Sequence, residues 1–557
     1  MNSPYILVTF NLNNKDRKKY QSLFDNAEYV YEDQFFSEGK YKSFFNKDDY
    51  SIVLDQSVDY IQQEMEMLVT KTGLLESTLM HQLAVGVSCD MHPVIYYFFL
   101  KRILQRYKDY DVICLTNSIG FSSFCVGEGL SRSIDFRYVE GRSIKSILKK
   151  FFVGFRFSFF LVLIWRFIYL VFSSFKLKIR SFFLSKPTLK SDMIIFTTVD
   201  ISTQSNGNYS NYYFDTFINS IQGKISYTTI TSDFSRHFSM YRFLSLIALM
   251  KSFMQSLITT LRILFYIPRH HLYFAFSLIN NLQRLYCQRL FFQDYSPKYL
   301  LYKDEVYLPG RITSLAVSCL DIKTYGFQHA INSKYHPVYH HLKFYRSYPN
   351  LFPNFLLAYG NYSKKLFSMY GYPENKIYCI GSDRIYNTVL ELKGNKKNEK
   401  NSLLFISPDT KLSFDRVYPN LIKNFDRIYI RPHPSPYLGD VFLFDNDSVN
   451  DVQKQYKGVT VIDSKNESVS QSLDRVDYVF SDIQSTVYLD ALLRHKVVVY
   501  LSYDQLVDYY DLSYWGVQVV SHLDQVDWTL VADSLHVVNE VKGTTTFLDL
   551  ILNVEKM

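Results

Sequence analysis

The chain has 557 residues, of which 47% are hydrophobic and 20% are charged, and its formal net charge is +8. This length is too great for one hydrophobic core and predicts two or three domains, while the composition excludes a disordered chain. The six cysteines form no Cys-x-x-Cys pair and no His/Cys cluster: Cys89, Cys114, Cys125, Cys287, Cys319 and Cys379. We therefore expect a reducing compartment and no structural zinc. The opening residues, MNSPYILVTFNLNN, are typical of a strand and not of a signal peptide, so we expect a cytoplasmic protein.

The first 140 residues mix strand-like runs, YILVTF and DVICLTN, with a helical run from Leu74 to Arg106, and this mixture predicts an α/β region. The next range, 141–293, is basic and rich in aromatic residues. Gly141 to Ser191 holds eleven Lys/Arg and no Asp/Glu, and Phe234 to Gln293 holds seven and again none, so the rest of the chain is net acidic. We expect range 141–293 to form a helical, membrane-associating insertion.

Two apolar runs lie in this basic range. Phe157–Phe175 is long enough to be a transmembrane candidate, although Arg166 sits at its centre. A second run, starting at Phe243, carries Lys251 and Arg262. Apolar helices with basic faces typically lie in the interface of an anionic membrane, which is our preferred interpretation. Long core helices with solvated basic faces are the alternative, and nucleic-acid binding is disfavoured because no recognition motif accompanies the helices.

Strands and helices alternate again from about residue 294. Residues 294–394 complete the N-terminal domain, and the polar linker Leu392 to Ser402 marks the clearest boundary in the chain. Residues 402–540 then read strand LLFISP, a helix, strand RIYIRPHP, strand VTVIDS, a helix, strand YVFSD, a helix and strand VVVYLS. Such alternation predicts parallel βαβ units, and hence two α/β domains that enclose a cleft.

Two motifs follow strands of the C-terminal domain. In RIYIRPHPSP, two prolines force the chain out of the sheet and hold His433 beside Arg431 at the strand's carboxyl end, where open α/β sheets bind ligands. In SDIQST, Ser485 and Thr486 fall in the first turn of the next helix, whose free N–H groups suit a phosphate. Simple capping, with Ser481 and Gln484 as a capping box, is the structural alternative.

Arg-Pro-His-Pro followed by Ser-Asp-Ile-Gln-Ser-Thr resembles the C-terminal domain of bacterial GT-B glycosyltransferases of surface polysaccharide synthesis. The motifs are similar both to those of sialyltransferases and Kdo transferases and to those of CDP-glycerol glycerophosphotransferases. The resemblance implies a GT-B fold, with two Rossmann-like domains facing a cleft, and implies that His433, Pro434, Ser485 and Thr486 bind a cytidine nucleotide and its phosphate. Upstream, GFQHA resembles the Gln-His-Gly element of the same superfamily, although Ala330 stands where Gly is usual.

Sugar transfer needs a base for the acceptor hydroxyl. Asp304 and Glu305 stand at a strand end in YKDEVYLPG and are the first candidates, with Glu305 ahead, and His329 is the competing base. A solvated carboxylate pair and a cleft-lining His are the plain alternatives. The run HPVYHH, from His336 to His341, lacks acidic partners at ligand spacing, so we interpret it as a loop and expect metal-independent catalysis without a cofactor.

These observations predict a cytoplasmic enzyme bound peripherally to the inner face of the cell membrane. Its donor would be a CMP-linked nonulosonic sugar, sialic acid-like or Kdo-like, and its acceptor a glycan or lipid-linked glycan of a capsule or lipopolysaccharide. A CDP-glycerol or CDP-ribitol polyol-phosphate transferase is the nearest rival, a UDP-sugar transferase comes third, and a non-catalytic assembly scaffold is the alternative from another class.

Overall fold

The computed structural model describes 26 segments of the chain. They are residues 4–10, 19–32, 41–43, 47–80, 93–116, 119–130, 134–138, 172, 191–197, 201–203, 209–211, 221, 223–231, 240–271, 278–303, 306–328, 333–381, 401–406, 411–431, 454–463, 467–482, 485, 487–502, 511–532, 534–541 and 547–554. Most of the basic range 141–191 lies outside them, and so does the transmembrane candidate Phe157–Phe175 apart from Phe172.

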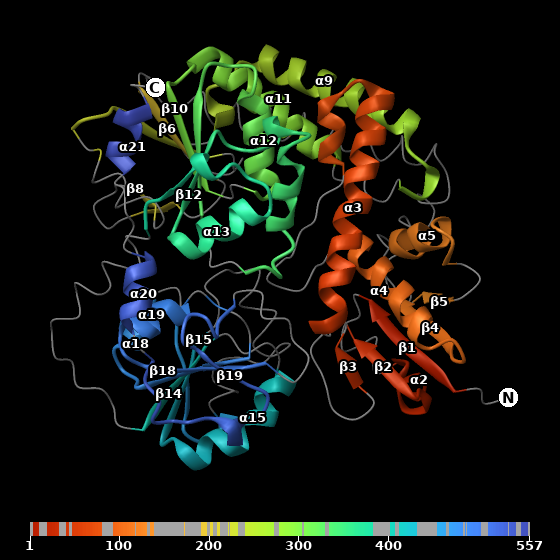
Figure 1. The fold of residues 1–557 in the computed structure, drawn as a ribbon, viewed down its shortest axis with the longest axis vertical. Coiled ribbons are helices and arrows are strands. Elements are labelled where there is room, and N and C mark those ends of the chain that lie inside the picture. Colours follow the sequence, from red (N-terminus) through yellow and green to blue (C-terminus); the bar gives the residue numbers. More distant parts are fainter. Residues whose placement is uncertain are drawn as a thin grey trace.

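Three parallel sheets follow one another along the chain (Figure 1). The first has the order β3-β2-β1-β4-β5. Its strands are β1 (Tyr5–Phe10), β2 (Tyr29–Glu32), β3 (Tyr41–Ser43), β4 (Asp111–Thr116) and β5 (Ile134–Tyr138), and its helices are α2 (Gln21–Asn26), α3 (Lys47–Thr72), η1 (Leu75–Leu79), α4 (Pro93–Arg106) and α5 (Ile119–Gly127). The central strands β1 and β4 are continuous apolar runs, buried on both faces, as parallel strands require.

The second sheet has six strands in the order β13-β12-β11-β10-β6-β9. They are β6 (Met193–Thr197), β9 (Tyr227–Thr231), β10 (Tyr299–Lys303), β11 (Lys323–Phe327), β12 (Phe355–Ala358) and β13 (Ile377–Cys379); a small antiparallel pair, β7 (Ile201–Thr203) and β8 (Tyr209–Asn211), stands apart. Strands β6 and β9 belong to range 141–293, for which the sequence predicted only helices. That range is therefore partly sheet: β6 pairs with β10, about a hundred residues further along the sequence, and β9 pairs with β6.

Several helices belong to the second sheet and connect its strands. They are η3 (Met240–Arg242), α9 (Leu246–Tyr266), η4 (Arg269–His271), α11 (Leu278–Tyr295), α12 (Leu308–Val317), η5 (Tyr339–Tyr345), η6 (Pro349–Leu351), α13 (Asn361–Met369) and η7 (Glu374–Lys376). Side chains alternate along β10: Leu300 and Tyr302 pack with α9 and α11, whereas Tyr299 and Leu301 join the core shared with the C-terminal part.

The third sheet, order β16-β15-β14-β17-β18-β19, is also fully parallel. Its strands are β14 (Ser402–Ile406), β15 (Arg427–Arg431), β16 (Val459–Val461), β17 (Tyr478–Ser481), β18 (Val497–Leu501) and β19 (Gln518–Val520), and its helices are α15 (Lys411–Asn424), α18 (Val469–Leu473), α19 (Val487–Leu493) and η9 (Leu523–Gln525). The strand and helix order predicted for residues 402–540 is confirmed, and so is the α/β class with Rossmann-like parallel sheets.

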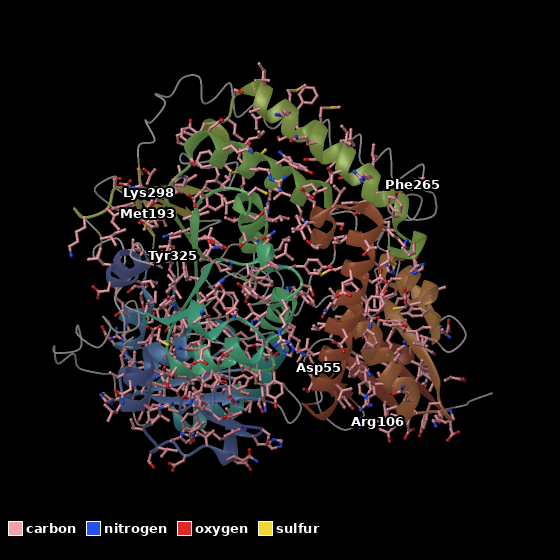
Figure 2. All side chains as sticks on the ribbon, turned by 45° about the horizontal axis from the view of Figure 1, so that its top comes forward. Asp55, Arg106, Met193, Phe265, Lys298 and Tyr325 are labelled. Atoms are coloured by element: carbon pink, nitrogen blue, oxygen red, sulfur yellow. The ribbon has the colours of Figure 1, made fainter. Side chains whose placement is uncertain are left out.

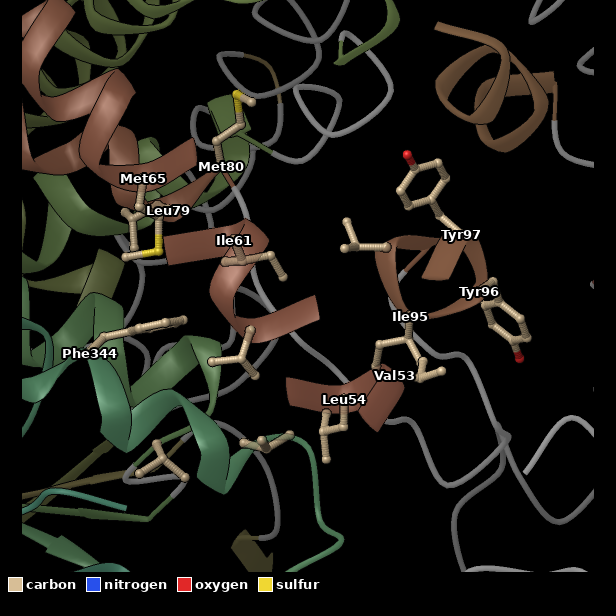
Figure 3. Packing of buried hydrophobic residues seen from close by; sticks show 14 of the residues in the cluster. Val53, Leu54, Ile61, Met65, Leu79, Met80, Ile95, Tyr96, Tyr97 and Phe344 are labelled. Carbon is tan, nitrogen blue, oxygen red and sulfur yellow. The ribbon is translucent and has the colours of Figure 1, made fainter. Parts of the chain in front are cut away.

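The helix α3 joins the first sheet to the second. Its buried face, including Val53, Leu54 and Ile61, belongs to one apolar cluster that reaches Ile95 of α4 on one side and Phe344 of η5 on the other. Figure 3 shows these side chains on their separate elements. The first α/β unit is therefore packed onto the second through a continuous apolar core.

The end of the chain returns from the third sheet to the second. After α20 (Ser534–Val541), helix α21 (Phe547–Val554) lies beside the second sheet, near the end marked C in Figure 1. The ring of Phe547 meets that of Tyr325 on β11, with centroids 5.6 Å apart and planes at 90°. In α20, Glu540 Oε2 accepts a hydrogen bond of 3.1 Å from the backbone N–H of Tyr362, in the first turn of α13. Both an apolar ring contact and a hydrogen bond thus connect the two six-stranded sheets.

Gly360 is required by this return contact. A Cβ at Gly360 would lie 2.0 Å from the carbonyl oxygen of Glu540, although the φ of −168° is ordinary extended backbone. We expect Gly360→Ala to lower the free energy of unfolding by about 1–3 kcal/mol, measured by urea denaturation, because a backbone atom must move. Lys365→Ala, exposed on the same helix, is the control and should change it by less than about 0.5 kcal/mol. Equal stabilities of the two variants would contradict this packing.

Candidate active site

The third sheet reverses its winding direction between β14 and β17. From β14 the chain proceeds to β15 and β16 on one side, whereas from β17 it proceeds to β18 and β19 on the other. Such a reversal is a topological switch point, and open α/β sheets bind ligands outside the carboxyl ends of their strands at such a point. The predicted motifs follow β15 and β17, the two neighbours of β14, so both start at this edge.

Arg431 is the last residue of β15, and its buried guanidinium faces the start of α18. Nη2 donates to the carbonyl oxygen of Glu467 at 2.8 Å, and Nη1 donates to Ser472 Oγ at 2.8 Å and to the carbonyl oxygen of Ser468 at 3.4 Å. Ser468 caps α18 in a capping box with Gln471. Arg431 thus ties the carboxyl end of β15 to the beginning of α18, and Pro-His-Pro is the next stretch of the sequence.

Two serines order the other side of the switch point. Ser481, the last residue of β17, is buried and donates its hydroxyl to the carbonyl oxygen of Ile406 at 2.6 Å, which joins the ends of β17 and β14. Ser485 Oγ accepts from the backbone N–H of Val487 at 3.3 Å and so caps α19. The capping box was predicted for Ser481 with Gln484, and Gln484 lies outside the described residues; the Ser481 hydroxyl itself donates to the end of β14.

The second sheet has a switch point of the same kind, between β6 and β10. β10 ends at the buried Lys303, and Asp304 and Glu305 come directly after it in the sequence. β11 ends at Phe327, and His329 follows after one residue. That residue, Gln328, is fully buried, and its Oε1 accepts from the backbone N–H of Tyr359 at 2.8 Å, which connects the ends of β11 and β12.

Six of the eight predicted site residues lie outside the described residues: Asp304, Glu305, His329, His433, Pro434 and Thr486. Arg431 and Ser485 are described: Arg431 ends β15, and Ser485 lies between β17 and α19. The fold brings the residues preceding all of the motifs to the carboxyl edges of two parallel sheets, next to their switch points.

The sequence predicted a loop for the HPVYHH run. In the structure this run is a packed segment that leads into η5. His340 and His341 lie in that 3-10 helix. His340 contacts the carbonyl oxygen of Lys334 at 2.8 Å through Nε2, and burial lowers its pKa to about 4. His336 Nε2 lies 3.3 Å from the hydroxyl of Tyr307. These contacts account for the histidines as packing residues.

Sequence reasoning missed a polar cluster beneath the switch point. The buried Arg494, at the end of α19, contacts Asp474 and Ser470 of the α18 region, and Asp490 is buried on the same helix. The available signal was the pair of charged residues inside the otherwise apolar helix YLDALLR. This cluster fixes α18 and α19, the two helices that begin beside the switch point.

No protein-family model and no curated protein sequence matches this chain. Among solved structures, it is similar to the UDP-GlcNAc 2-epimerase from Neisseria meningitidis bound to UDP-GlcNAc, with 12% identity and a TM-score of 0.37 over 65% of this chain and 92% of that one. It is also similar to the glycosyltransferase SnogD from Streptomyces nogalater (10% identity, TM-score 0.36, 65% and 99%) and to the lipopolysaccharide outer core galactosyltransferase WaaB in its apo form (9%, 0.29, 55% and 80%). Superpositions this loose carry no argument, so the fold assignment rests on the sheet orders.

Replacing Arg431 by Lys tests its positioning role. A lysine cannot span both the Glu467 carbonyl and the Ser472 hydroxyl, so we expect the free energy of unfolding to fall by about 1.5–3 kcal/mol in urea denaturation. Arg475→Lys is the matched control, because exposed Arg475 binds the Glu467 carboxylate at 2.9 Å and such surface pairs contribute about 0–1 kcal/mol. If Arg431→Lys lowers the free energy of unfolding no more than Arg475→Lys does, the hydrogen bonds of Arg431 do not stabilise the carboxyl end of β15.

Proposed function

We propose that this chain is a glycosyltransferase of bacterial surface polysaccharide synthesis that transfers a nonulosonic-type sugar from a CMP-sugar to a glycan or lipid-linked acceptor. The observation that carries the proposal is the position of the motifs. The donor-binding and base candidates, which are far apart in sequence, directly follow strands at the switch points of two consecutive parallel sheets. That is where α/β domains bind nucleotides and their substrates.

The third sheet would hold the donor. In the sequence, His433 and Pro434 follow β15, while Ser485 and Thr486 lie between β17 and α19, and β14 lies between β15 and β17 in the sheet. Hydroxyls and an imidazole here can bind the phosphate and compensate its charge as it leaves. The buried contacts of Arg431 hold the strand end rigid, and a rigid edge lowers the entropic cost of ordering the ligand.

The second sheet would supply the base. A carboxylate of Glu305 or Asp304 would accept the proton of the acceptor hydroxyl as its oxygen forms a bond to the anomeric carbon. The bond between that carbon and the phosphate oxygen breaks, and CMP leaves with the electron pair. His329 is the alternative base, since it follows the neighbouring strand β11.

Helix α9 supports attachment to an anionic membrane surface. Its buried face includes Ser252, Ser256 and Thr260, whose hydroxyls bind backbone carbonyls within the helix. Its exposed face carries large apolar side chains, among them Leu246, Ile247, Met250, Met254, Ile258, Phe265 and Tyr266. Ile247 is 81% exposed and Phe265 77%, and Figure 2 shows Phe265 on the outside near the end of the helix.

The buried face also holds Leu249, Phe253, Ile263 and Leu264, so α9 is apolar on both sides, whereas an ordinary surface helix exposes mainly polar side chains. Helix α9 also exposes the basic residues Lys251 and Arg262. An exposed apolar face together with basic side chains suits the boundary between lipid headgroups and acyl chains. Among the described residues, α9 is also the helix whose length and composition would allow it to cross a bilayer, with 39% of the apolar window buried. We propose that α9 lies on the inner face of the cell membrane, which brings the site close to lipid-linked acceptors.

Nucleotide selectivity tests the donor. In thermal-shift titrations with CMP, CDP, UDP and GDP, we expect CMP to raise the melting temperature most, because a ligand that binds only the folded state stabilises it by mass action. His433→Ala should abolish the CMP shift without changing the melting temperature of the free protein. His495→Asn is the matched control, since exposed His495 has a φ of +54° that Asn tolerates.

Each other outcome of this titration identifies a rival. A larger shift with CDP would favour polyol-phosphate transfer from a CDP-alcohol, and a shift with UDP or GDP would reject the cytidine donor. If none of the four nucleotides stabilises the protein, the transferase proposal fails and a non-catalytic scaffold explains the fold.

Vesicle binding tests the role of α9. We expect the double variant Ile247→Glu/Phe265→Glu to lower partitioning onto phosphatidylglycerol-containing vesicles by about ten-fold or more in co-sedimentation, because it removes two apolar anchors and adds repulsion. Met369→Glu is the control, since Met369 is 63% exposed on α13 and does not belong to the exposed apolar face of α9. Unchanged partitioning of the double variant would mean that another part of the chain binds the vesicles, and no binding by the native protein would reject the membrane proposal.

A further inference from the structure

Two histidines and a carboxylate converge beside the first sheet. Glu128 follows the end of α5, and His270 and His271 lie in η4, just after α9. Glu128 Oε1 lies 3.0 Å from His270 Nε2 and 3.0 Å from His271 Nε2. One ligand atom from each residue lies within 4.8 Å of the others, and the described part of the chain contains one such group of His, Cys, Asp or Glu.

The spacing of these atoms suits a four-coordinate metal ion. Zinc binds imidazole nitrogen and carboxylate oxygen at about 2.0–2.2 Å, so two ligand atoms on a tetrahedron lie about 3.3 Å apart. The observed separations of 3.0 Å are within a few tenths of an ångström of that edge. Imidazole ligands favour zinc and related transition metals over magnesium or calcium.

The surroundings of His271 match the second layer of a metal site. The ring is 1% exposed, and its other nitrogen, Nδ1, lies 3.2 Å from Glu64 Oε2 on α3. A carboxylate on the far nitrogen is the usual partner of a metal-bound histidine, because it fixes the ring orientation and makes the ligand more basic. The hydroxyl of Tyr60, also on α3, lies 3.0 Å from His271 Nε2 and could hydrogen-bond a water in the fourth position.

Gly127 makes room for this arrangement. A Cβ at that position would lie 2.2 Å from Cγ of His270 and 2.6 Å from its Nδ1. The imidazole of His270 therefore reaches Glu128 only because Gly127, the residue before Glu128, has no side chain.

We propose that Glu128, His270 and His271 form a binding site for one divalent ion of the zinc class, with Glu64 as the carboxylate behind His271. The site lies among the helices of the first sheet and not on either sheet that carries the transferase motifs. It connects α3, the end of α5 and the segment after α9, which are up to 211 residues apart in sequence. The ion would anchor the end of α9 to the first α/β unit, independently of the proposed transfer reaction.

Zinc titration of the chelator-stripped full chain tests the site. We expect calorimetry to give about one ion per chain and zinc to raise the melting temperature, since a structural zinc site stabilises the fold that binds it. Glu64→Gln should weaken zinc binding about 10–100-fold, the usual effect of losing such a partner, and Glu128→Gln and His270→Gln should weaken it further. Gly127→Ala should also weaken binding although it removes no ligand, and His495→Asn should leave binding unchanged.

A cobalt spectrum of the native protein keeps the test decisive if a variant fails to fold. Co²⁺ in this site should give the strong visible bands of four-coordinate geometry, and zinc should displace them. The proposal is overturned if the native chain takes up no more zinc than Glu128→Gln, or if cobalt shows only the weak spectrum of six-coordinate geometry. In either case the cluster is a hydrogen-bond network, whose variants lower the melting temperature equally with and without zinc.

Discussion

The return of the C-terminal helices onto the second sheet is the contact on which the rest of this structure depends. Phe547 packs edge-on against Tyr325, and the same apolar cluster continues into β14, β15, β17 and β18 of the third sheet. Around it, Tyr362 donates to Asp511 at 2.7 Å and stacks on Tyr514, with ring centroids 4.3 Å apart. Two sheets that could fold separately therefore share one core, which limits how their switch points can move relative to each other.

A proposed two-substrate reaction needs this arrangement. A donor on the third sheet and a base on the second can react only if the chain holds both edges within reach of one sugar, and small displacements are costly in rate. The polar part of the contact, between Glu540 and the start of α13, is weaker than the apolar part. It is the part that can break and re-form if the two domains close on a substrate.

The sequence predicted the third sheet well because its strands are short, continuous apolar runs bounded by polar turns. It failed at β6 and β9, because the basic and aromatic composition of range 141–293 suggested helices on a membrane and gave no sign that β6 would pair with β10. The strand ends could be predicted, and with them the places of Arg431 and Ser485. The hydrogen-bond partners could not be predicted from the sequence, because tertiary structure brings Glu467 and Ser472 to Arg431 and Ile406 to Ser481.

The cluster of Glu128, His270 and His271 shows the same limit more clearly. A metal motif is readable when its ligands share one helix or one loop, whereas here 142 residues separate Glu128 from His270. Only the packing of α3, α5 and η4 brings them together. The neighbouring cysteines are not involved, because Cys125 is fully buried and burial raises the pKa of its thiol.

Helix α9 has features of both interpretations that the sequence left open, since one side packs in the core and the other exposes large apolar side chains. Thr259 lies 2.7 Å from the hydroxyl of Tyr286, and Ser252 lies 3.1 Å from Cys287 Sγ, so small polar side chains let α9 and α11 approach closely. Leu249, Phe253, Ile263 and Leu264 fill the rest of that buried face, and the remaining large apolar side chains of α9 point outward, where in water they gain nothing from burial. A face of this composition stabilises the protein only when something apolar covers it, and a lipid surface does so without a complementary protein shape.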